Sequence, residues 1–478
     1  MQVALLLLAG IFLSLDINRQ LVDYDEATYA KVVVDTLDSG NVLTFQLNGN
    51  NWFEKPPLYL WLAMGGVLLF GEQEYAFRIP SILASILCCW LVYLIVRKLT
   101  RDQIAATAGF LILLFSNAFF VYAREVRLDS AVVAALLATL FFFIKSWENE
   151  KYLLWIFPLI AIGFLFKSVI ILLVVPVIFF YSIFYRKWWY LKNKYLWFGG
   201  LPALAIIVPW HLYETVQFGH AFWRDYLGTQ VFHRATATLT GSNGIGDYFI
   251  LFIPWYLPWN AVLLISLALL IVFSRLKQFA GRVSLREIAA PLIVAIFIFS
   301  AFTLARTHLG SYVMPAFPFF AMCIAISWHQ LSSCLPRFKI TLASIMSVLL
   351  IAGSVFCIYL MPGKVPEYTL DERAIGRAYK AQNINNAPLY ALGWLATETL
   401  NYYGNTRTQH IDPAVVRGTI LHGPFYLLVD PPSASYFFYS RVWPIAPSLK
   451  LVYEGRYFIL IYSDRDLQMP MFQYVQRP

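Results

Sequence analysis

Long apolar blocks dominate the chain and predict helices that cross a membrane. After an apolar segment at residues 3–15, similar blocks recur at about 79–96, 104–122, 130–147, 153–166, 169–185, 196–213, 257–273, 288–304, 311–328 and 340–360. These blocks approach the length that a helix needs to cross roughly 30 Å of hydrocarbon, and the strict alternation of a membrane β-barrel is absent. The pattern predicts a polytopic α-helical membrane protein with about 11–13 spans.

A polar segment from Asp16 to Arg78 follows the first apolar block and contains one amphipathic stretch. Residues 27–37 have helical spacing, with Tyr29, Val32, Val33 and Leu37 on one face and Lys31 and Asp35 off it. Asp23 and Glu26 resemble a capping box at its start, and Gly40 marks its end. We expect this helix to lie flat on the membrane surface.

The last part of the chain differs in composition from the rest, because charges, Asn and turn residues are spread evenly through it. Helical spacing covers 371–382, buried strands are expected at 389–392 and 426–429, and 451–462 reads as a hairpin. We therefore divide the chain into a membrane domain, 1–360, and a small α/β soluble domain, 361–478.

Composition excludes several classes of protein and indicates an orientation. The chain is 59% hydrophobic and only 13% charged, and its five cysteines suit neither a disulfide framework nor a zinc site. The net charge of +9 comes from dispersed cations, so we expect no nucleic-acid partner. Lys and Arg are concentrated in the short connections on one side, which places the segments 16–78 and 214–247 and the C-terminal domain outside.

Ionisable residues return to the outer level of the membrane at several places. Asp25 and Glu26 follow the first span, and Glu54 and Lys55 precede a proline pair. Ionisable groups at membrane level are costly and usually functional. The alternative for Asp25 and Glu26 is that they only complement the positive end of the following helix.

Further charges stand between the predicted third and fourth spans, where four lie within Arg124–Asp129. Arg124 and Glu125 are equally explained as a salt-bridged helix cap, and Asp129 either caps the next helix or points into a cavity. Lys167 interrupts two apolar runs at the same level, where its alternative role is to extend to the membrane interface.

The remaining outer connections offer weaker candidates. His233 lies beside Arg234 in the second long outer segment, and isolated histidines in a loop are a weak metal signal. Arg306 and Tyr312 stand before a proline-containing helix start, where Tyr312 either belongs to an aromatic belt or reaches a phosphate or a sugar hydroxyl.

A transporter or flippase is the main alternative function, because buried carboxylates also couple transport to ions. Such a protein commonly shows inverted repeats and broken helices in two matching halves. The sequence shows no such symmetry, and its polar residues gather on one side of the membrane instead of at the middle, which favours a reaction at the surface.

These motifs together resemble a known family. The segments that carry the resemblance are Asp25-Glu26, Asn48-Gly49, Phe53-Glu54-Lys55-Pro56-Pro57-Leu58, Arg78-Ile79-Pro80-Ser81, Arg124–Asp129, Phe166-Lys167-Ser168 and Tyr312–Pro315. In order and spacing they resemble bacterial polyprenyl-phosphate glycosyltransferases of the GT-C type, above all lipid A aminoarabinose transferases and their protein O-mannosyltransferase relatives. The resemblance covers nearly all of the membrane part.

The resemblance implies roles for individual residues. Asp25, with Glu26 beside it, becomes the main catalytic carboxylate, and Asp129 becomes a second acidic residue in the cavity. Lys55, Tyr312 and either Arg234 or Arg306 become contacts to the carrier phosphate. Glu54, Arg127 and Lys167 line the substrate cavity. Glu54 and His233 are the candidates for holding a divalent cation, and no other cofactor is implied.

The resemblance also implies a reaction and a location. A sugar would pass with inversion from a polyprenyl (undecaprenyl) phosphate carrier to a lipid A, glycan or protein acceptor. The site and the C-terminal domain would face the periplasm, on the outer side of a bacterial inner membrane. The segment before Tyr312 departs from the family, which commonly has a lysine where this chain offers Arg306 and His308.

Overall fold

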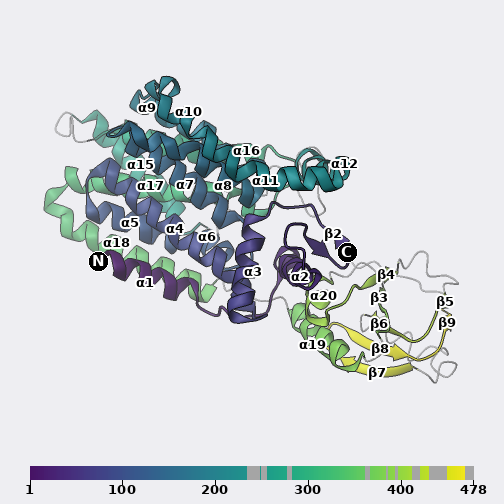
Figure 1. The fold of residues 1–478 in the computed structure, drawn as a ribbon. Helices are drawn as coiled ribbons and strands as arrows, with labels where there is room; N and C mark the ends of the chain where they lie inside the picture. The colour runs from purple at the N-terminus through teal and green to yellow at the C-terminus, as the bar shows by residue number, and fades with distance from the viewer. Residues whose placement is uncertain are drawn as a thin grey trace. The chain divides into compact units, whose positions relative to one another are not determined.

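The computed structural model describes residues 1–233, 248, 256–276, 283–360, 367–383, 386–392, 397–411, 420–429 and 449–468. Contacts divide the chain into two compact units, which we call the membrane unit and the C-terminal unit. The membrane unit comprises Met1–Ile17 and Phe53–Gly363, and the C-terminal unit comprises Asn18–Trp52 and Lys364–Pro478. Each unit is described by itself, and the elements of both are labelled in Figure 1.

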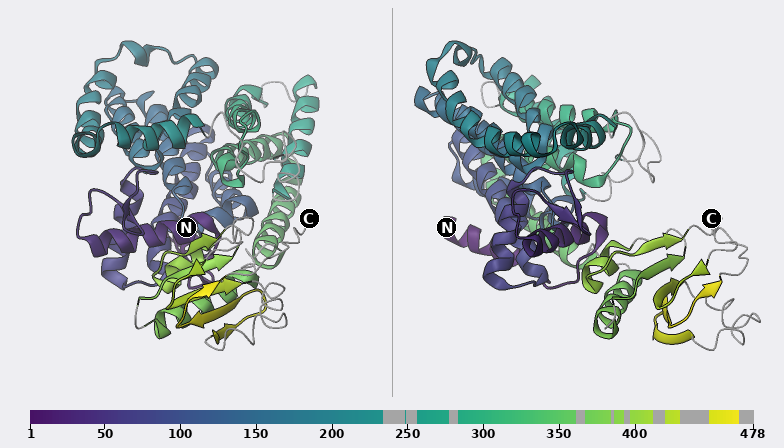
Figure 2. Two further views of the ribbon diagram at one scale, coloured as in Figure 1. Left: turned by 90° about the vertical axis from the view of Figure 1, so that its right-hand side faces the viewer. Right: turned by 45° about the vertical axis from the view of Figure 1, so that its right-hand side comes forward.

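The membrane unit is a bundle of apolar helices (Figures 1 and 2). Within the described residues, seven helical stretches are long and apolar enough to cross a membrane, or eight if the bent pair α5 and α6 forms one span. The shorter apolar helices are α1, α3 and α15. The chain is therefore a multi-span helical membrane protein, as the apolar pattern predicted.

The elements of this unit have the following bounds: α1 Gln2–Leu13, α3 Leu58–Phe70, α4 Glu74–Thr100, α5 Gln103–Leu114, α6 Asn117–Ala123, α7 Asp129–Ser146, η1 Glu150–Trp155, α8 Ile156–Lys167, η2 Ser168–Leu173, α9 Val174–Tyr185, η3 Trp189–Lys192, α10 Lys194–Phe198, α11 Gly200–Phe218, α12 His220–Trp223, η4 Arg224–His233, α15 Trp259–Arg275, α16 Leu285–Thr303, η6 Gly310–Ala316, α17 Phe317–Cys334, η7 Pro336–Phe338, α18 Lys339–Val355 and η8 Phe356–Leu360.

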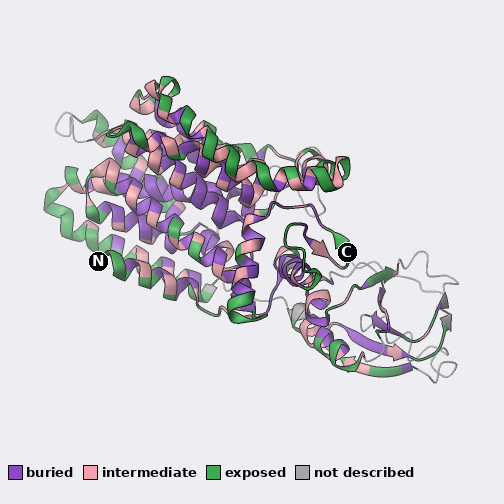
Figure 3. Cartoon of the chain, viewed as in Figure 1, coloured by how far each residue is buried: buried purple, intermediate pink, exposed green. Residues whose placement is uncertain are grey.

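Helices α4, α7 and α17 form the buried centre of the bundle (Figure 3). Small residues allow close packing there: a Cβ on Gly109 of α5 would lie 3.3 Å from the side chains of Val92 and Val96 on α4. Helices α11 and α18 instead expose large apolar side chains such as Leu201 and Ile340. An apolar exterior of this kind is stable against lipid rather than water.

Residues 150–185 form two helices that turn back on each other at Ser168. Phe142, towards the end of α7, contacts Trp155 just before α8, and Trp147 contacts Tyr185 at the end of α9. Lys167, in the middle of the stretch, instead binds Asp129 at the start of α7. Ser168 has a φ of 50°, which breaks the helix. Two spans, as predicted at 153–166 and 169–185, explain these contacts better than one long helix does.

Helix α3 lies within the segment that we treated as one polar region. Its sequence is apolar throughout, but its thirteen residues are short for a span. Gly66 of α3 faces the carbonyl oxygen of Ala76, and a Cβ there would collide with that backbone atom. Helices α3 and α4 therefore approach closely, and the polar sequence is limited to either side of α3.

The C-terminal unit is built on a five-stranded sheet in the order β4-β3-β6-β8-β7. Strands β3, β4 and β6 run parallel, and β8 pairs antiparallel with β6 and β7. The elements are α2 Asp23–Ser39, β1 Gln46–Leu47, β2 Asn50–Asn51, α19 Glu367–Gln382, β3 Leu389–Leu392, α20 Glu398–Gly404, β4 Gln409–Ile411, β5 Ile420–Leu421, β6 Phe425–Val429, β7 Leu449–Glu454, β8 Ile459–Ser463 and β9 Leu467–Gln468. The predicted helix, buried strands and hairpin all form.

Strand β6 shows why this sheet is stable. Phe425, Leu427 and Val429 point into one hydrophobic cluster, and Tyr426 and Leu428 into another, as the alternation along a strand requires. Helices α19 and α20 contribute Ile375, Tyr379 and Leu400 to the second cluster. The sheet is therefore buried on both faces at β6.

Helix α2 packs against α20 within this unit, although the division at residue 360 assigned it to the membrane domain. Lys31, which we placed on the polar face, is buried and donates to Asp35 Oδ1 at 2.6 Å and to Asn405 Oδ1 at 2.7 Å. Lys31 and Asp35 do share a polar face, as predicted, but helical periodicity could not show that a distant segment covers that face.

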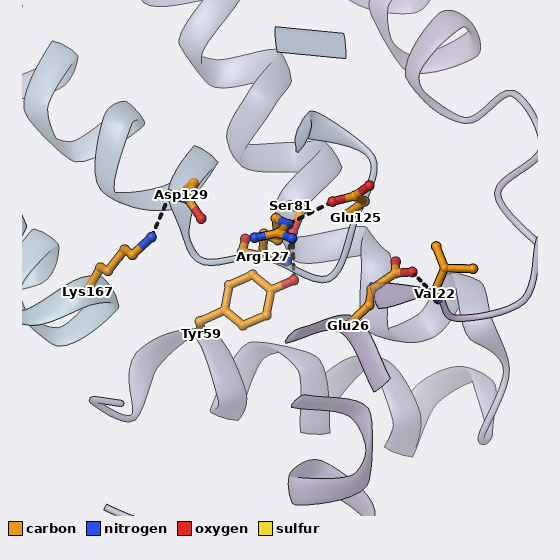
Figure 4. Close-up of polar contacts among 8 residues, drawn as sticks. All are labelled: Val22, Glu26, Tyr59, Ser81, Glu125, Arg127, Asp129 and Lys167. Carbon is orange, nitrogen blue, oxygen red and sulfur yellow. Dashed lines mark hydrogen bonds and ion pairs between the residues drawn. The ribbon is translucent and has the colours of Figure 1, made fainter. Parts of the chain in front are cut away.

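The start of α2 also differs in detail from the expected capping box. Val22 is the N-cap, and its backbone N–H donates to Glu26 Oε2 at 2.9 Å (Figure 4). The predicted capping box would place this bond on the backbone N–H of Asp23, so Glu26 reaches one residue further back than predicted. The helix ends at Gly40, with a φ of 72°, as expected.

Candidate active site

Ser81 joins three segments at one end of the bundle (Figure 4). Its Oγ lies 2.6 Å from the Tyr59 hydroxyl of α3, donates to the carbonyl of Arg127 at 2.9 Å and accepts the N–H of Arg127 at 3.2 Å. All three contacts are buried. The loop that carries the charges of Arg124–Asp129 is thereby fixed against α3 and α4.

Within this loop, Glu125 and Arg127 form a buried ion pair. Arg127 Nε donates to Glu125 Oε2 at 2.7 Å, and the guanidinium lies 5.3 Å from the centre of the Tyr122 ring. Arg124 binds the backbone carbonyl of Leu15 and lies over Phe120. The salt-bridge alternative thus holds for Glu125, with Arg127 as its partner.

Asp129, Lys167 and Tyr312 come together from three elements, as their shared position at outer turns of the chain suggested. Lys167 Nζ, at the end of α8, donates to Asp129 Oδ1 at 2.5 Å (Figure 4). The same Nζ lies 5.7 Å from the centre of the Tyr312 ring in η6. Leu128 is the N-cap of α7, so Asp129 does not cap its helix. Because Lys167 pairs with Asp129, it does not extend freely into solvent.

An apolar groove of about 520 Å³ begins beside this cluster. It runs between α3, α4, α7 and α8, and its lining includes Tyr59, Pro80, Ala131 and Phe166. Phe166 precedes Lys167, and Ala131 follows Asp129 by two residues, so one end of the groove lies near the charged cluster, whose own side chains are not part of the lining. Small residues on α3 and α7, such as Gly65, Ala134, Ala135 and Ala138, leave the space open.

Lys55 lies in a loop that packs against the second outer segment. It is buried, 3.7 Å from Glu54, and donates to Gln230 Oε1 of η4 at 3.2 Å. Phe53 contacts the rings of Phe218 and Phe222. The sequence predicted a role for Lys55 but not for Gln230. The one sequence feature near Gln230 that could have indicated a packed segment is the group of aromatic residues just before it.

The aromatic residues around η4 form a compact cluster. Tyr226 stacks on Phe222 and lies 3.2 Å from His211 Nε2 through its hydroxyl. Burial raises the pKa of the Tyr226 hydroxyl well above its ordinary value, because the charged phenolate would be poorly solvated there. This cluster holds η4, and with it Gln230, against α11.

The remaining predicted residues lie elsewhere in the chain. Asp25 and Glu26 lie on α2 and are described with the C-terminal unit. Arg306 is exposed before η6, and His308 Nε2 lies 3.1 Å from the Thr303 carbonyl. Arg234 lies outside the described residues.

The described residues offer no cluster suited to a metal ion. Among them, no three His, Cys, Asp or Glu side chains gather closely enough to hold a cation. Glu54 and His233 are therefore not united in such a cluster within the part of the chain described here. Lys55 and Lys167 are two buried or partly buried cations of the membrane unit that could face a phosphate.

Comparison with solved structures defines the class of fold. The chain superposes on the crystal structure of ArnT from Cupriavidus metallidurans bound to undecaprenyl phosphate, with a TM-score of 0.73, 19% identity and 96% coverage of both chains. The oligosaccharyltransferase of Archaeoglobus fulgidus in its apo form matches with a TM-score of 0.52 and 12% identity, covering 91% of this chain and 70% of that one. The protein has the fold of the GT-C glycosyltransferases.

Sequence comparison identifies particular relatives. Residues 54–213 match the family described as dolichyl-phosphate-mannose-protein mannosyltransferase. Over 331 residues the chain is 28% identical to the undecaprenyl phosphate-alpha-4-amino-4-deoxy-L-arabinose arabinosyl transferase of Pseudomonas aeruginosa, covering 65% of this chain and 57% of that protein. The enzyme of the same name from Edwardsiella ictaluri is 26% identical over 324 residues, covering 64% and 55%.

The predicted resemblance to these transferases is thereby confirmed. The chain spans somewhat more than half the length of these two curated relatives.

Proposed function

We propose that the protein is an inverting glycosyltransferase that uses a polyprenyl-phosphate sugar as its donor. The observation that carries the proposal is the apolar groove that begins beside Asp129, Lys167 and Tyr312. An apolar channel with a charged end suits a lipid whose head group is an anionic phosphate. The arabinosyl transferase relatives, whose names specify an undecaprenyl phosphate donor, support this reading.

The groove would hold the polyprenyl chain and the cations would hold its phosphate. Cleavage of the bond between the anomeric carbon and the phosphate oxygen leaves additional negative charge on the phosphate. Lys55 and Lys167 would stabilise that charge, with Arg306 and Tyr312 as further contacts. Such preorganised groups act more strongly in a partly dry site than in water.

Asp25 would act on the acceptor side of the sugar. A carboxylate there removes the proton of an acceptor hydroxyl, or orients an acceptor that is already an anionic phosphate. Attack opposite the leaving phosphate inverts the anomeric carbon in one displacement. Glu26, through its bond to Val22, would hold the start of the helix that carries Asp25.

We place the reaction on the periplasmic side of a bacterial inner membrane, with a lipid A, glycan or protein acceptor. The concentration of Lys and Arg in the opposite loops supports this orientation. The described charges of the bundle also favour a surface reaction over transport. Glu125, Arg127, Asp129 and Lys167 lie at helix ends, whereas transport coupling generally uses charges near the middle of the membrane.

The test compares cells that express the wild-type protein, the Asp25→Asn variant or neither. Mass spectrometry of their glycolipids, surface glycans and exported proteins should reveal an added sugar in the wild type alone. Immunoblotting of membranes confirms that the variant inserts and accumulates normally. An added sugar that persists in the Asp25→Asn cells would refute the role of Asp25, and profiles that agree in all three strains would refute the function.

A further inference from the structure

The helix that carries Asp25 is anchored to the C-terminal fold on both sides of that residue. Before Asp25, the backbone N–H of Leu21 donates to the Tyr403 hydroxyl at 3.0 Å. After it, Lys31 Nζ donates to Asn405 Oδ1 at 2.7 Å. The two anchors bracket Asp25, four residues after the first and six before the second.

The first anchor is buried and specific. Leu21 is fully buried, so its N–H depends on a protein acceptor, and leaving such a group unpaired is costly. The Tyr403 ring is itself held, with the guanidinium groups of Arg373 and Arg377 at 5.2 and 5.5 Å from its centre. The hydroxyl therefore presents a fixed acceptor to the chain that leads into α2.

The second anchor is a small network. Lys31 Nζ is shared between Asn405 and Asp35, and the other oxygen of Asp35 accepts the backbone N–H of Asn48 at 2.7 Å. The network thus ties α2 to the β1–β2 hairpin as well as to α20. Asn405 has a φ of 45°, in the left-handed region just after α20, and this conformation directs its amide.

The elements that supply both anchors are packed tightly. Gly376 of α19 faces Gly404 of α20, and a Cβ on Gly376 would lie 2.9 Å from the Gly404 backbone nitrogen. Tyr403 and Asn405 flank Gly404, so the helix crossing fixes both anchors at once. Helix α2 consequently has little freedom to turn or slide relative to the C-terminal sheet.

We propose that Tyr403 and Asn405 are positioning residues for Asp25, so that the C-terminal fold sets the orientation of the catalytic carboxylate. This inference rests on the proposed function. Catalysis requires a reacting group to be held within a fraction of an ångström, and a misplacement of about 1 Å can cost roughly a hundredfold in rate. The donor contacts proposed above all lie in the membrane unit and need not change when an anchor is lost.

Two pairs of variants of the full-length protein test the inference. Tyr403→Phe removes only the hydroxyl that accepts from Leu21, and Tyr390→Phe is its control, because the Tyr390 hydroxyl bonds to no described residue. Asn405→Gly removes the amide but keeps the left-handed backbone, which glycine adopts readily. Asn405→Asp restores an acceptor for Lys31 and should behave like the wild type.

Kinetics use undecaprenyl phosphate that carries the sugar identified in the cell experiment. Tyr403→Phe and Asn405→Gly should lower kcat by about tenfold or more while the KM for the lipid donor stays within about twofold. Tyr390→Phe and Asn405→Asp should keep both constants. An unchanged kcat in the first two variants, or a loss in Asn405→Gly that Asn405→Asp does not restore, would overturn the proposal.

Hydrogen exchange measured on the same proteins without donor provides an independent readout. Amides of residues 21–35 should exchange faster in Tyr403→Phe and Asn405→Gly than in the wild type or the two controls. Exchange that stays at the wild-type rate would refute the anchoring. If exchange responds as expected but the wild type transfers no sugar, the proposed function fails while the anchoring stands.

Discussion

Lys167 Nζ lies 2.5 Å from Asp129 Oδ1, although 38 residues separate them in the chain. The pair joins the end of α8 to the start of α7, and both side chains are largely withdrawn from solvent. It stands at the end of the apolar groove, beside Tyr312. One contact thus contributes both to the packing of two helices and to the charge at the candidate site.

Breaking this pair should reduce both stability and activity. Lys167→Met leaves the Asp129 carboxylate buried without its cation, which costs roughly 3–5 kcal/mol when one partner of a buried pair is removed. The thermal midpoint in detergent should fall accordingly. The double variant Lys167→Met/Asp129→Asn should recover most of that stability but not sugar transfer. Recovery of transfer in the double variant would exclude both residues from the reaction.

Lys98 offers a matched control for this prediction. It pairs with Glu148, and this pair is considerably more exposed than that of Lys167 and Asp129. Exposed pairs contribute only about 0–1 kcal/mol. Lys98→Met should therefore leave the thermal midpoint and sugar transfer close to those of the wild type.

Lys55→Ala should weaken use of the lipid donor. A hydrogen bond to a charged group contributes about 1.5–3 kcal/mol, so the apparent KM for the donor should rise roughly 10- to 100-fold. Lys55→Arg keeps the positive charge and should restore much of the affinity. Steady-state kinetics over a donor titration measure both effects, and an unchanged KM in Lys55→Ala would remove this residue from the phosphate site.

The meeting of Asp129, Lys167 and Tyr312 could be predicted from sequence because of the cost of placing charge in an apolar environment. Lys167 interrupts two apolar runs, and Asp129 and Tyr312 stand at the starts of apolar helices, all at the same expected level of the membrane. The sequence therefore favoured one shared polar site. The bond between Tyr59 and Ser81 could not be predicted, since neither a tyrosine nor a serine in an apolar helix indicates its partner. Helix α3 was overlooked because it is short and has polar sequence on both sides.

The packing of α2 against α20 shows a different limit of sequence patterns. Lys31 and Asn405 lie 374 residues apart in the chain, and the periodicity of a short segment cannot predict such a contact. The amphipathic pattern of α2 correctly indicated a helix. It could not show that Lys31 would be buried by a partner at the other end of the chain.

Filling the groove should discriminate between donors by chain length. Ala131→Leu adds bulk beside Asp129 and should impair every polyprenyl donor. Ala138→Leu adds the same bulk about two turns further along α7 and should impair only donors long enough to reach it. Transfer rates measured with undecaprenyl and with two-isoprene donors check this. Equal rates for Ala138→Leu and wild type with the long donor would contradict the assignment of the groove.

Glu372 should make the C-terminal unit less stable as the pH rises. Burial, followed by the nearby charge of Glu398, raises the pKa of Glu372 from 4.5 to about 8. Between these values the folded protein binds a proton that the unfolded chain releases. The contribution of Glu372 to stability is therefore fully present below about pH 4.5, and an amount on the order of 3 kcal/mol of it is lost between pH 5 and pH 8.

Glu372→Gln should remove this dependence, because glutamine keeps the shape of the protonated acid and cannot ionise. Hydrogen exchange of residues 370–404, corrected for the intrinsic effect of pH, should show opening that increases between pH 5.5 and 8 in the wild type and is nearly constant in the variant. Glu454→Gln alters an exposed glutamate on β7 of the same unit and should keep the wild-type profile. A wild-type profile in Glu372→Gln would assign the dependence to other groups, and Glu398, whose pKa burial also raises, would be the next to test.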